Sequence, residues 1–418
     1  MATDAVFNEV LKRYTPFKMI LEEVKKRNWF IETVNKKTDW NGGVMEIPIE
    51  LASGGSMAWG QLVDENDIAD GVSKVLTLTA SDLKECWGAM NFRQKDLNRH
   101  DDLKKSYLEL LPGKLNSFSG EMSEQVSNTI FGDGSLATVT TASSAGASTQ
   151  GIVIVDNTHF LKVGMKVYFD DNDSAPASTY IGAIDINTGA VKCVTTRGGS
   201  TQTDLTAMSV AQGAKMYIEG AQAQGPTKLK DLLLSAANGG LAQVYNAGFD
   251  KSIYPALQAV NINGSTFTQA TLLKDYYKAF FTILEKGKGN LNKKMVIPFS
   301  HMSVITAQLE GQKQYVATDK KAGYGFTSVS VMGPDGVAEF VAVRGCSKTL
   351  AYVLDMETVH LCGNQFFKRD KDANGNEFYV KRATTGKVNI VDTAFEAELV
   401  ISNLSHNGII HSIPAVLP

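Results

Sequence analysis

Apolar and polar residues alternate from Met45 to Leu51, directly after the turn residues Asn41-Gly42-Gly43. A period of two is typical of a strand with one buried face. Pro48 lacks a backbone donor, which favours an edge strand or an isolated ribbon. A second alternating run, Lys74 to Thr79, predicts the partner strand of an extended β-ribbon. Because a two-stranded ribbon is marginally stable alone, we expect it to pack on a neighbouring subunit.

The segment that joins these two strands carries the candidate contact residues. Met57 and Trp59 are large apolar side chains, and Asp64, Glu65 and Asp67 belong to an acidic run. We expect the apolar pair to be buried on a neighbour, with the acids near basic residues. The alternatives are a solvated loop and a metal site, because carboxylate oxygens suit calcium.

Helical spacing predicts elements on both sides of the ribbon. Residues 3 to about 37 read as short helices, with apolar residues such as Val6 and Val10 at helical intervals among many basic residues. This pattern fits either a solvated helical face or an arm that lies on a neighbour or faces DNA. Residues 101–131 carry an apolar stripe that ends at Ile130, which predicts a longer helix.

The composition changes between Ser135 and about Gly220. This stretch is rich in Thr, Ser, Ala, Gly and Val and has no helical periodicity. Short apolar runs and a tight turn at Asn187-Thr188-Gly189 predict a compact all-β insertion, a small barrel, over residues 135–221. Two lines within it resemble each other, Gly164 to Tyr168 and Gly213 to Tyr217.

Helices and strands alternate irregularly from residue 222 to the end. Residues 227–245 and Thr268 to Lys286 carry helical stripes, and Leu350 to Leu354 is an apolar run typical of a central strand. Phe395 to Ile401 alternates with two glutamates, which predicts a strand with one face in water. Few β-α-β units are present, so the class is α+β and not a doubly wound nucleotide domain.

Composition and charge limit the possible functions. The 418 residues suggest two or three domains, with 43% hydrophobic and 20% charged residues, as in ordinary globular proteins. The formal net charge of -3 argues against a dedicated DNA-binding protein, which is usually basic. The N-terminus, Met1 to Asp4, shows no signal peptide, and no apolar run approaches the roughly 20 residues that span a bilayer. The four cysteines are scattered and are expected to be free thiols.

The search for catalytic and metal-binding motifs favours a protein that is not an enzyme. Asp370 to Gly375 opens like a calcium loop, but Lys381 stands where the final glutamate is required, so a hairpin turn is the better interpretation. Asp170 to Asp173 reads as a solvated tip. None of the six histidines stands at zinc-ligand spacing, and His301 and His360 are expected to be structural. We therefore predict no catalytic residue, no cofactor and no metal.

The order of the segments resembles that of major capsid proteins of tailed bacteriophages with the Hong Kong 97-type fold. The ribbon from Gly43 to Thr79 is similar to the family's extended loop, and the helix ending at Phe131 is similar to its spine helix. The closing passages, Gly386 to Asn403 and Asn407 to Ile410, look like its final strands. The resemblance is architectural, because the family has no short diagnostic motif, and it covers nearly the whole chain.

The resemblance implies a division of the chain into an arm, a loop and domains. These are an N-terminal arm (1–42), an extended β-ribbon loop (43–80), a peripheral domain with the spine helix (81–134), the β insertion domain (135–221), a mainly axial domain (222–345) and the C-terminal strands of the axial and peripheral domains (346–418).

The resemblance also implies partners and a location. The subunit would self-assemble, as hexamers and pentamers, into an icosahedral head shell that encloses double-stranded DNA in the virion. Assembly would take place in the bacterial host cytoplasm, with scaffolding, portal and decoration proteins as possible partners. Contact with DNA would be weak and non-specific, and no membrane is involved. Because the arm starts at once, a separate scaffolding protein or a cleaved segment is implied. No crosslinking residues are predicted.

Two other functions remain open from the residues. The chain could form an encapsulin-like compartment or be another phage structural protein, which cargo would distinguish from a phage head. A hydrolytic enzyme with a β insert would need a polar pocket with paired acids or a metal, and the sequence shows no such set.

Overall fold

The computed structural model divides the chain into two units, and the second is inserted into the first. The first unit comprises residues 1–123 and 226–418, and the second comprises residues 124–225. The structure describes residues 29–39, 44–52, 72–79, 82–93, 118, 120–132, 134–142, 150–170, 178–206, 208, 210–218, 226–244, 249–287, 289, 291–310, 328–333, 336–343, 345–363, 367–369, 379–383, 386–415 and 417.

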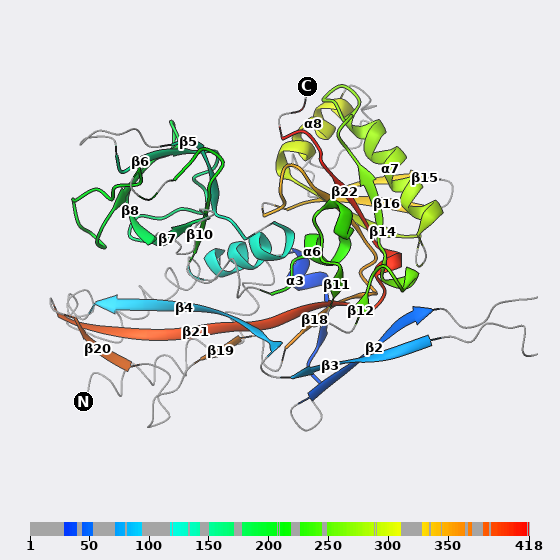
Figure 1. Ribbon diagram of the computed structural model, residues 1–418, viewed down its shortest axis with the longest axis horizontal. Helices are drawn as coiled ribbons and strands as arrows, with labels where there is room; N and C mark the ends of the chain where they lie inside the picture. The colour runs from blue at the N-terminus through cyan, green and yellow to red at the C-terminus, as the bar shows by residue number, and fades with distance from the viewer. Residues whose placement is uncertain are drawn as a thin grey trace, which may run out of the picture. The chain divides into compact units, whose positions relative to one another are not determined.

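The first unit contains a six-stranded mixed sheet, drawn at the upper right of Figure 1. In sheet order, its strands are β13 (Val260–Asn263), β22 (Gly408–His411), β17 (Ala351–Leu354), β14 (Lys293–Ile297), β16 (Gly336–Ala342) and β15 (Ser328–Gly333). All four residues of β17 are buried. The prediction of a central strand at Leu350 to Leu354 is therefore confirmed.

Two helices pack beside this sheet and form the core with it (Figure 1). They are α7 (Leu272–Lys286) and α8 (Phe299–Glu310). The apolar stripe of α7 buries Tyr276, Phe280 and Ile283. Tyr276 meets Phe267 and Phe340 edge-on, with ring centroids 5.4 and 6.1 Å apart. The helical periodicity predicted from the sequence is thus confirmed, with the helix starting at Leu272 instead of Thr268.

A second sheet of the first unit is organised around the 16-residue strand β21, drawn in orange-red in Figure 1. It contains β1 (Asn35–Lys37), β4 (Lys84–Arg93), β18 (Val359–Cys362), β19 (Phe367–Arg369), β20 (Tyr379–Ala383) and β21 (Gly386–Ile401). The apolar face predicted for Phe395 to Ile401 is buried, but Glu396 and Glu398 are also only 8% and 6% exposed. The expected wet face is therefore wrong, because the Thr227 amide approaches that face and donates to Glu398 Oε1 at 2.9 Å.

The predicted ribbon is present as β2 (Val44–Ala52) and β3 (Val72–Thr79). Among the described residues the two strands pair only with each other. One face of the ribbon buries Met45, Ile47, Ile49, Leu76 and Leu78. β2 contacts η4 (Pro255–Leu257), and Lys74 Nζ lies 5.7 Å from the centre of the Tyr254 ring. The base of the ribbon thus packs on its own unit, so the expectation that its stability requires a neighbour is wrong for this part.

The N-terminal arm is described only at its end. Residues 1–28 lie outside the described residues. α3 (Trp29–Thr33) is followed by β1, which pairs in parallel with β18. The helix predicted up to about residue 37 is therefore wrong for residues 35–37, because their backbone groups pair with those of β18.

The chain between residue 226 and β13 is less helical than expected. It forms α6 (Leu229–Leu233), η3 (Ala236–Asn238), β11 (Gln243–Val244) and β12 (Phe249–Asp250). The Ser235 amide donates to Asn261 Oδ1 at 2.9 Å instead of continuing α6. Gly239 then adopts a positive φ of 88°. The predicted helix over 227–245 is thus wrong beyond Leu233, because a side chain distant in sequence ends it.

The second unit contains a closed six-stranded barrel. Its strands are β5 (Ala137–Thr141), β6 (Ile152–Val155), β7 (Lys166–Phe169), β8 (Ser178–Asp185), β9 (Ala190–Val194) and β10 (Lys215–Ile218), in the closed order β10-β5-β6-β9-β8-β7. Closure leaves no unpaired edge strand. Buried side chains including Val153, Phe169, Ile181 and Met216 form its core. The expected all-β insertion fits this barrel.

The two similar lines of the insertion are neighbours in the barrel. They form β7 and β10, which pair antiparallel with Tyr168 opposite Tyr217. Each is preceded by a glycine in the left-handed region, Gly164 at φ 85° and Gly213 at φ 92°. A residue with a side chain rarely adopts this conformation, so the repeated glycine marks the same turn before both strands.

The fold class expected from the sequence is confirmed as α+β. Residues 120–131 are helical, with Met122, Val126 and Ile130 buried as the stripe predicted. The turn at Asn187 to Gly189 is also confirmed, since Asp185 accepts hydrogen bonds from the Asn187 amide and the Thr188 hydroxyl. Within the described residues no helix has the length and hydropathy needed to cross a membrane.

The barrel core provides a test of this packing. Phe169 is 1% exposed, so Phe169→Ala should destabilise the barrel by about 3–5 kcal/mol through lost burial and a cavity. Ile186→Ala, at an 81% exposed position of the β8–β9 turn, should change stability by less than about 0.5 kcal/mol. Hydrogen exchange of β7 and β10 amides in the full chain measures both. Equal protection in the two variants would contradict the described core.

Candidate functional site

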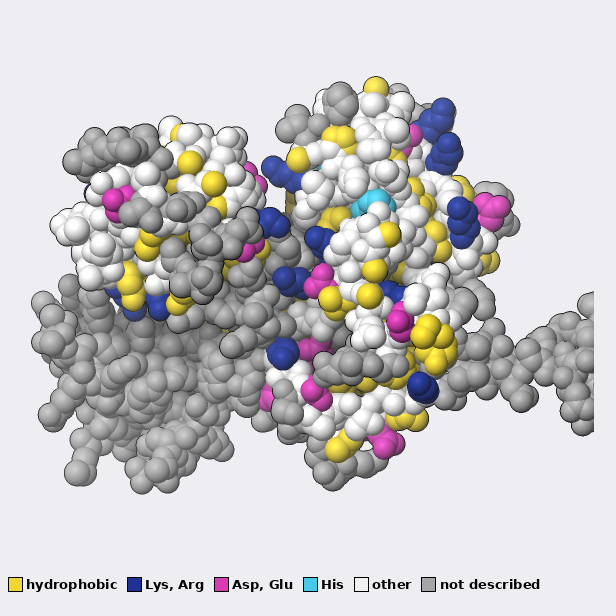
Figure 2. Space-filling view, in the orientation of Figure 1, with side chains coloured by type: hydrophobic (Ala, Val, Ile, Leu, Met, Phe, Trp, Pro, Cys, Tyr) yellow, Lys and Arg dark blue, Asp and Glu magenta, His cyan; other side chains and the backbone are white. Residues whose placement is uncertain are grey.

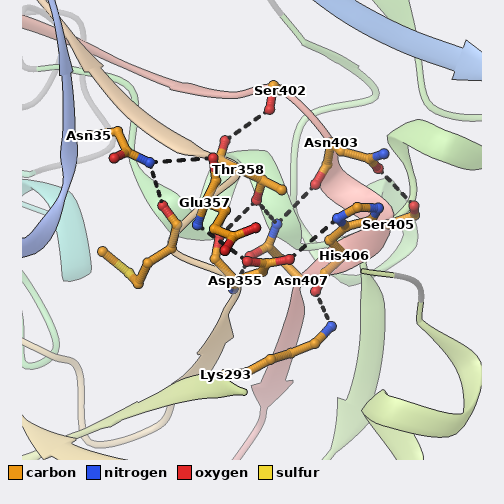
Figure 3. A network of polar contacts seen from close by, with 11 residues as sticks. Asn35, Lys293, Asp355, Glu357, Thr358, Ser402, Asn403, Ser405, His406 and Asn407 are labelled. Atoms are coloured by element: carbon orange, nitrogen blue, oxygen red, sulfur yellow. Dashed lines mark hydrogen bonds and ion pairs between the residues drawn. The ribbon is translucent and has the colours of Figure 1, made fainter. Parts of the chain in front are cut away.

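Two connections join the two six-stranded sheets of the first unit, and they meet at one buried polar cluster (Figure 3). Residues 355–358 lead from β17 to β18, and residues 402–407, which include η5 (Leu404–His406), lead from β21 to β22. We call the cluster the junction network; it consists of Lys293, Asp355, Thr358, Asn403, His406 and Asn407.

Asn407 is the centre of the junction network and is fully buried. Its side-chain oxygen accepts from the Asp355 amide at 2.8 Å, and its side-chain nitrogen donates to Thr358 Oγ1 and the Asn403 carbonyl at 3.0 and 2.9 Å. Its own amide donates to the Leu404 carbonyl, and its carbonyl accepts from the Val260 amide. One side chain therefore ties both connections together with all of its donors in use.

The charged members of the network are also buried. Asp355 and Lys293 are each 2% exposed. Lys293 Nζ donates to the His406 carbonyl, and burial lowers the pKa of Lys293 although the Asp355 charge opposes this. His406 Nδ1 lies 3.4 Å from Asp355 Oδ2, outside hydrogen-bonding geometry.

Gly289 makes room for the side chains of His406 and Asp355. Its φ is 87°, and a Cβ at this position would stand 2.3 Å from His406 Nδ1 and 2.8 Å from Asp355 Oδ2. Any other residue would combine backbone strain with a clash. The glycine in the loop after α7 is therefore required for the packing of the network.

The hydroxyl groups of the network make structural hydrogen bonds. The Ser405 hydroxyl donates to Asn403 Oδ1 at 2.8 Å, so it is not aligned with a base. The Thr358 hydroxyl donates to the Asp355 carbonyl at 2.9 Å. Among the described residues, no group of three or more His, Cys, Asp or Glu side chains is placed to hold a metal ion.

The residues predicted to make intersubunit contacts are not placed by the structure. Met57, Trp59, Asp64, Glu65 and Asp67 lie outside the described residues. The same is true of Asp370 to Gly375 and of Asp171 to Asp173. Their contact roles remain predictions.

The structure does place the two histidines expected to be structural. His301 is 2% exposed, and its Nδ1 lies 2.6 Å from the Tyr276 hydroxyl. His360 is 9% exposed in β18, and its Nδ1 has no hydrogen-bond partner. The cysteines Cys193, Cys346 and Cys362 are free and buried, and burial raises the pKa of Cys193 to about 12.

The sequence interpretation missed the junction network. Asp355 directly follows an apolar strand, and Asn407 directly precedes another. Such polar residues at strand ends are weak signals, since turns commonly carry Asp and Asn. These residues form one cluster only because two connections that are distant in sequence meet in the fold.

No protein-family model and no curated protein matches the chain. Solved structures do match. The chain is similar to the capsid asymmetric unit of cyanophage A-1(L), with 10% identity over 92% of each chain and a TM-score of 0.44. It is similar to the capsid of a native GTA particle, with 7% identity over 91% of this chain and 89% of that chain, and a TM-score of 0.43. The capsid of Myoviridae phage XM1 matches with 8% identity over 92% and 91%, and a TM-score of 0.35.

Asn407 offers a direct test of the junction network. Asn407→Ala would leave the buried Asp355 amide and Asn403 carbonyl without their partner, and each such loss costs about 1–3 kcal/mol. We expect the free energy of unfolding to fall by about 3 kcal/mol or more. Asn238→Ala, which removes one exposed bond to Ser235, is the control and should cost less than about 1 kcal/mol. Denaturant unfolding measures both, and similar values would refute the central role of Asn407.

The buried histidines predict a dependence of stability on pH. Burial, with smaller effects from Lys348 and Lys37, lowers the pKa of His301 and of His360 from 6.5 to about 4. Between these pH values the unfolded chain binds protons that the folded chain does not. The free energy of unfolding should therefore fall as pH decreases from 6.5 to about 4, by up to about 1.4 kcal/mol per pH unit for each histidine.

The buried Glu398 acts in the opposite direction, because burial raises its pKa and the folded chain then holds a proton that the unfolded chain has lost. The contribution of each histidine is therefore measured as the difference in the pH dependence of the free energy of unfolding between wild type and His301→Gln or His360→Gln. Each variant should show a smaller slope of stability against pH in this window. An unchanged slope in both variants would contradict the assignment.

Proposed function

We propose that the chain is the major capsid subunit of a tailed bacteriophage, with the Hong Kong 97-type fold, and that it self-assembles into an icosahedral head shell around double-stranded DNA. The observation that carries this proposal is the β2–β3 ribbon. Its two strands pair only with each other among the described residues, while one of its faces is anchored on its own unit.

The packing of its base fixes the orientation of the ribbon on its own unit. Ile47 and Ile49 are fully buried, and Lys74 stacks over Tyr254. The opposite face stays in solvent and carries Val75, 56% exposed, across from Pro48. A hairpin fixed at its base and open along its strands is suited to reach a neighbouring subunit. We propose that Met57, Trp59, Asp64, Glu65 and Asp67, in its connecting segment, make that contact.

A shell subunit must also keep its parts in a fixed relation, because each subunit is held by several neighbours. The junction network supports this requirement. Asn407 joins the two connections between the sheets, and the charges of Asp355 and Lys293 are buried with it. Breaking a buried charged group away from its partners is costly, so the two sheets should move as one body.

The proposal gives the chain no catalytic role. Two buried titratable groups make structural contacts: His301 with the Tyr276 hydroxyl, and Lys293 with the His406 carbonyl. A catalytic base would be expected in a cleft, next to a nucleophile. The proposal likewise includes no cofactor and no metal.

The proposed partners follow from the shell. Copies of the chain would form hexamers and pentamers, in contact with scaffolding, portal and decoration proteins, in a virion assembled in the host cytoplasm. On the face shown in Figure 2, several basic side chains of the described residues lie near one another at the upper right, with acidic side chains elsewhere on the face. The net charge of -3 supports only weak, non-specific contact with packaged DNA.

The division of the chain expected from the family is also part of the proposal. Residues 135–221 would be the insertion domain, and residues 222–345 and 346–418 would supply the axial domain and the C-terminal strands. The compact unit found in the structure, residues 124–225, includes the end of the helix before the barrel. The junction network would then hold the axial and peripheral parts together.

Shortening the ribbon tests the proposal. Residues 53–71 are replaced by Asn-Gly, which closes a two-residue hairpin between Ala52 and Val72. Because the base of the ribbon stays anchored, the variant should fold with the thermal stability of wild type but fail to form shells in sedimentation and electron microscopy.

The matched control is Val75→Thr, which keeps the ribbon and removes only an exposed apolar group. It should still assemble, with at most a moderate loss of yield. Shells of normal size from the shortened chain would overturn the proposed role of the ribbon.

A further inference from the structure

The first unit contains a cavity that the proposed function does not use. Its volume is about 470 Å³, within the range of small-ligand pockets. It lies where α6, η3, the β11–β12 hairpin and the chain before β13 meet, and its lining includes Leu233, Ala236, Ala242, Asp250, Lys251 and Ala259. Lys251 is the one cation among the described residues that line it.

Lys251 is buried without a carboxylate partner. It is 7% exposed, and its Nζ donates to the carbonyls of Asp231 and Leu234, both at 3.0 Å, near the end of α6. An ammonium has three donors, and these two bonds are the contacts that the described part of the chain supplies. Within it, no carboxylate lies at ion-pair distance from Nζ. A buried lysine is usually paired, and the described residues supply no ion pair to this one.

The pKa of Lys251 agrees with its burial and with the absence of an ion pair among the described residues. Burial lowers the pKa of Lys251 to about 8, and the more distant Asp231 charge only partly offsets it. The ammonium is therefore still mostly charged at neutral pH, at an energetic cost that an anion beside it would relieve.

The cavity favours one negative charge over two. Asp250 also lines it, and this exposed carboxylate is kept ionised because hydrogen bonds from Ser252 lower its pKa. Its repulsion is weakened by solvent, whereas the buried Lys251 charge is screened much less. A monocarboxylate gains more from Lys251 than it loses to Asp250, while a phosphate dianion gains twice the attraction but carries a desolvation cost that grows with the square of its charge.

The apolar residues that line the cavity are suited to contact a short aliphatic chain. Leu233, Ala236, Ala242 and Ala259 contribute small or aliphatic side chains. We propose that this cavity binds a carboxylate with a short aliphatic chain, held by the Lys251 ammonium. The carboxylate belongs either to a free small acid or to an Asp or Glu side chain of a second copy of the chain.

The test measures the pKa of Lys251 in the full chain by trace acetylation at a series of pH values, read by mass spectrometry. Butyrate is the probe and butyramide its neutral control. A carboxylate within about 4–6 Å shifts a pKa by about 1–3 units. Butyrate should therefore raise the midpoint for Lys251 from about 8 to about 9 or higher, and cut acetylation at pH 8 severalfold.

Exposed Lys274 in the same samples is the internal control and should be unaffected. Ala242→Leu changes an exposed lining residue and narrows the cavity. This variant should keep the midpoint of Lys251 without ligand and lose its response to butyrate. An equal shift with butyramide, or an unchanged response in Ala242→Leu, would overturn the assignment.

A second arm identifies the source of the carboxylate. Assembled particles are labelled without butyrate, and a raised midpoint there indicates a side chain from a neighbouring copy. Mere covering of Lys251 would lower acetylation without raising the midpoint. Only this arm rests on the proposed shell function, so the first remains valid if no shell forms. A midpoint that stays at about 8 in every sample would overturn the proposal.

Discussion

The hydrogen bonds of Asn407 are the constraint on which the first unit depends. The two sheets of this unit are joined by two connections, and Asn407 bonds to both of them from a fully buried position. Leaving a polar group unsatisfied at this buried position is costly, so we expect both connections to form their hydrogen bonds to Asn407 together. Asn407 therefore helps to fix the orientation of one sheet to the other.

This constraint explains features that are far from it in the sequence. Gly289 leaves space beside His406, and β13 is attached through the Val260 amide to the Asn407 carbonyl. η4 contacts η5 on one side and the ribbon strand β2 on the other. The base of the ribbon is thus connected, through packed elements, to the place where the two sheets are joined.

Periodicity was enough to predict the elements that bury one regular face. The alternation in β2 and β3, the stripe of α7 and the buried strand β17 all follow from local spacing. Local spacing failed where tertiary contacts decide the structure. α6 ends because Asn261 takes the Ser235 amide, and Glu398 is buried because Thr227 covers it. The junction network and the Lys251 cavity were not predicted at all, since each brings together polar residues that no local pattern connects.

The central claim is that copies of this chain build a shell through their ribbons, and the particles that the chain forms test it most directly. Electron microscopy of the full chain, combined with nuclease treatment of particles from phage-producing cells, measures both assembly and cargo. The account predicts closed icosahedral shells that protect double-stranded DNA. A chain that stays monomeric under assembly conditions, or shells that hold a protein cargo and no DNA, would contradict it.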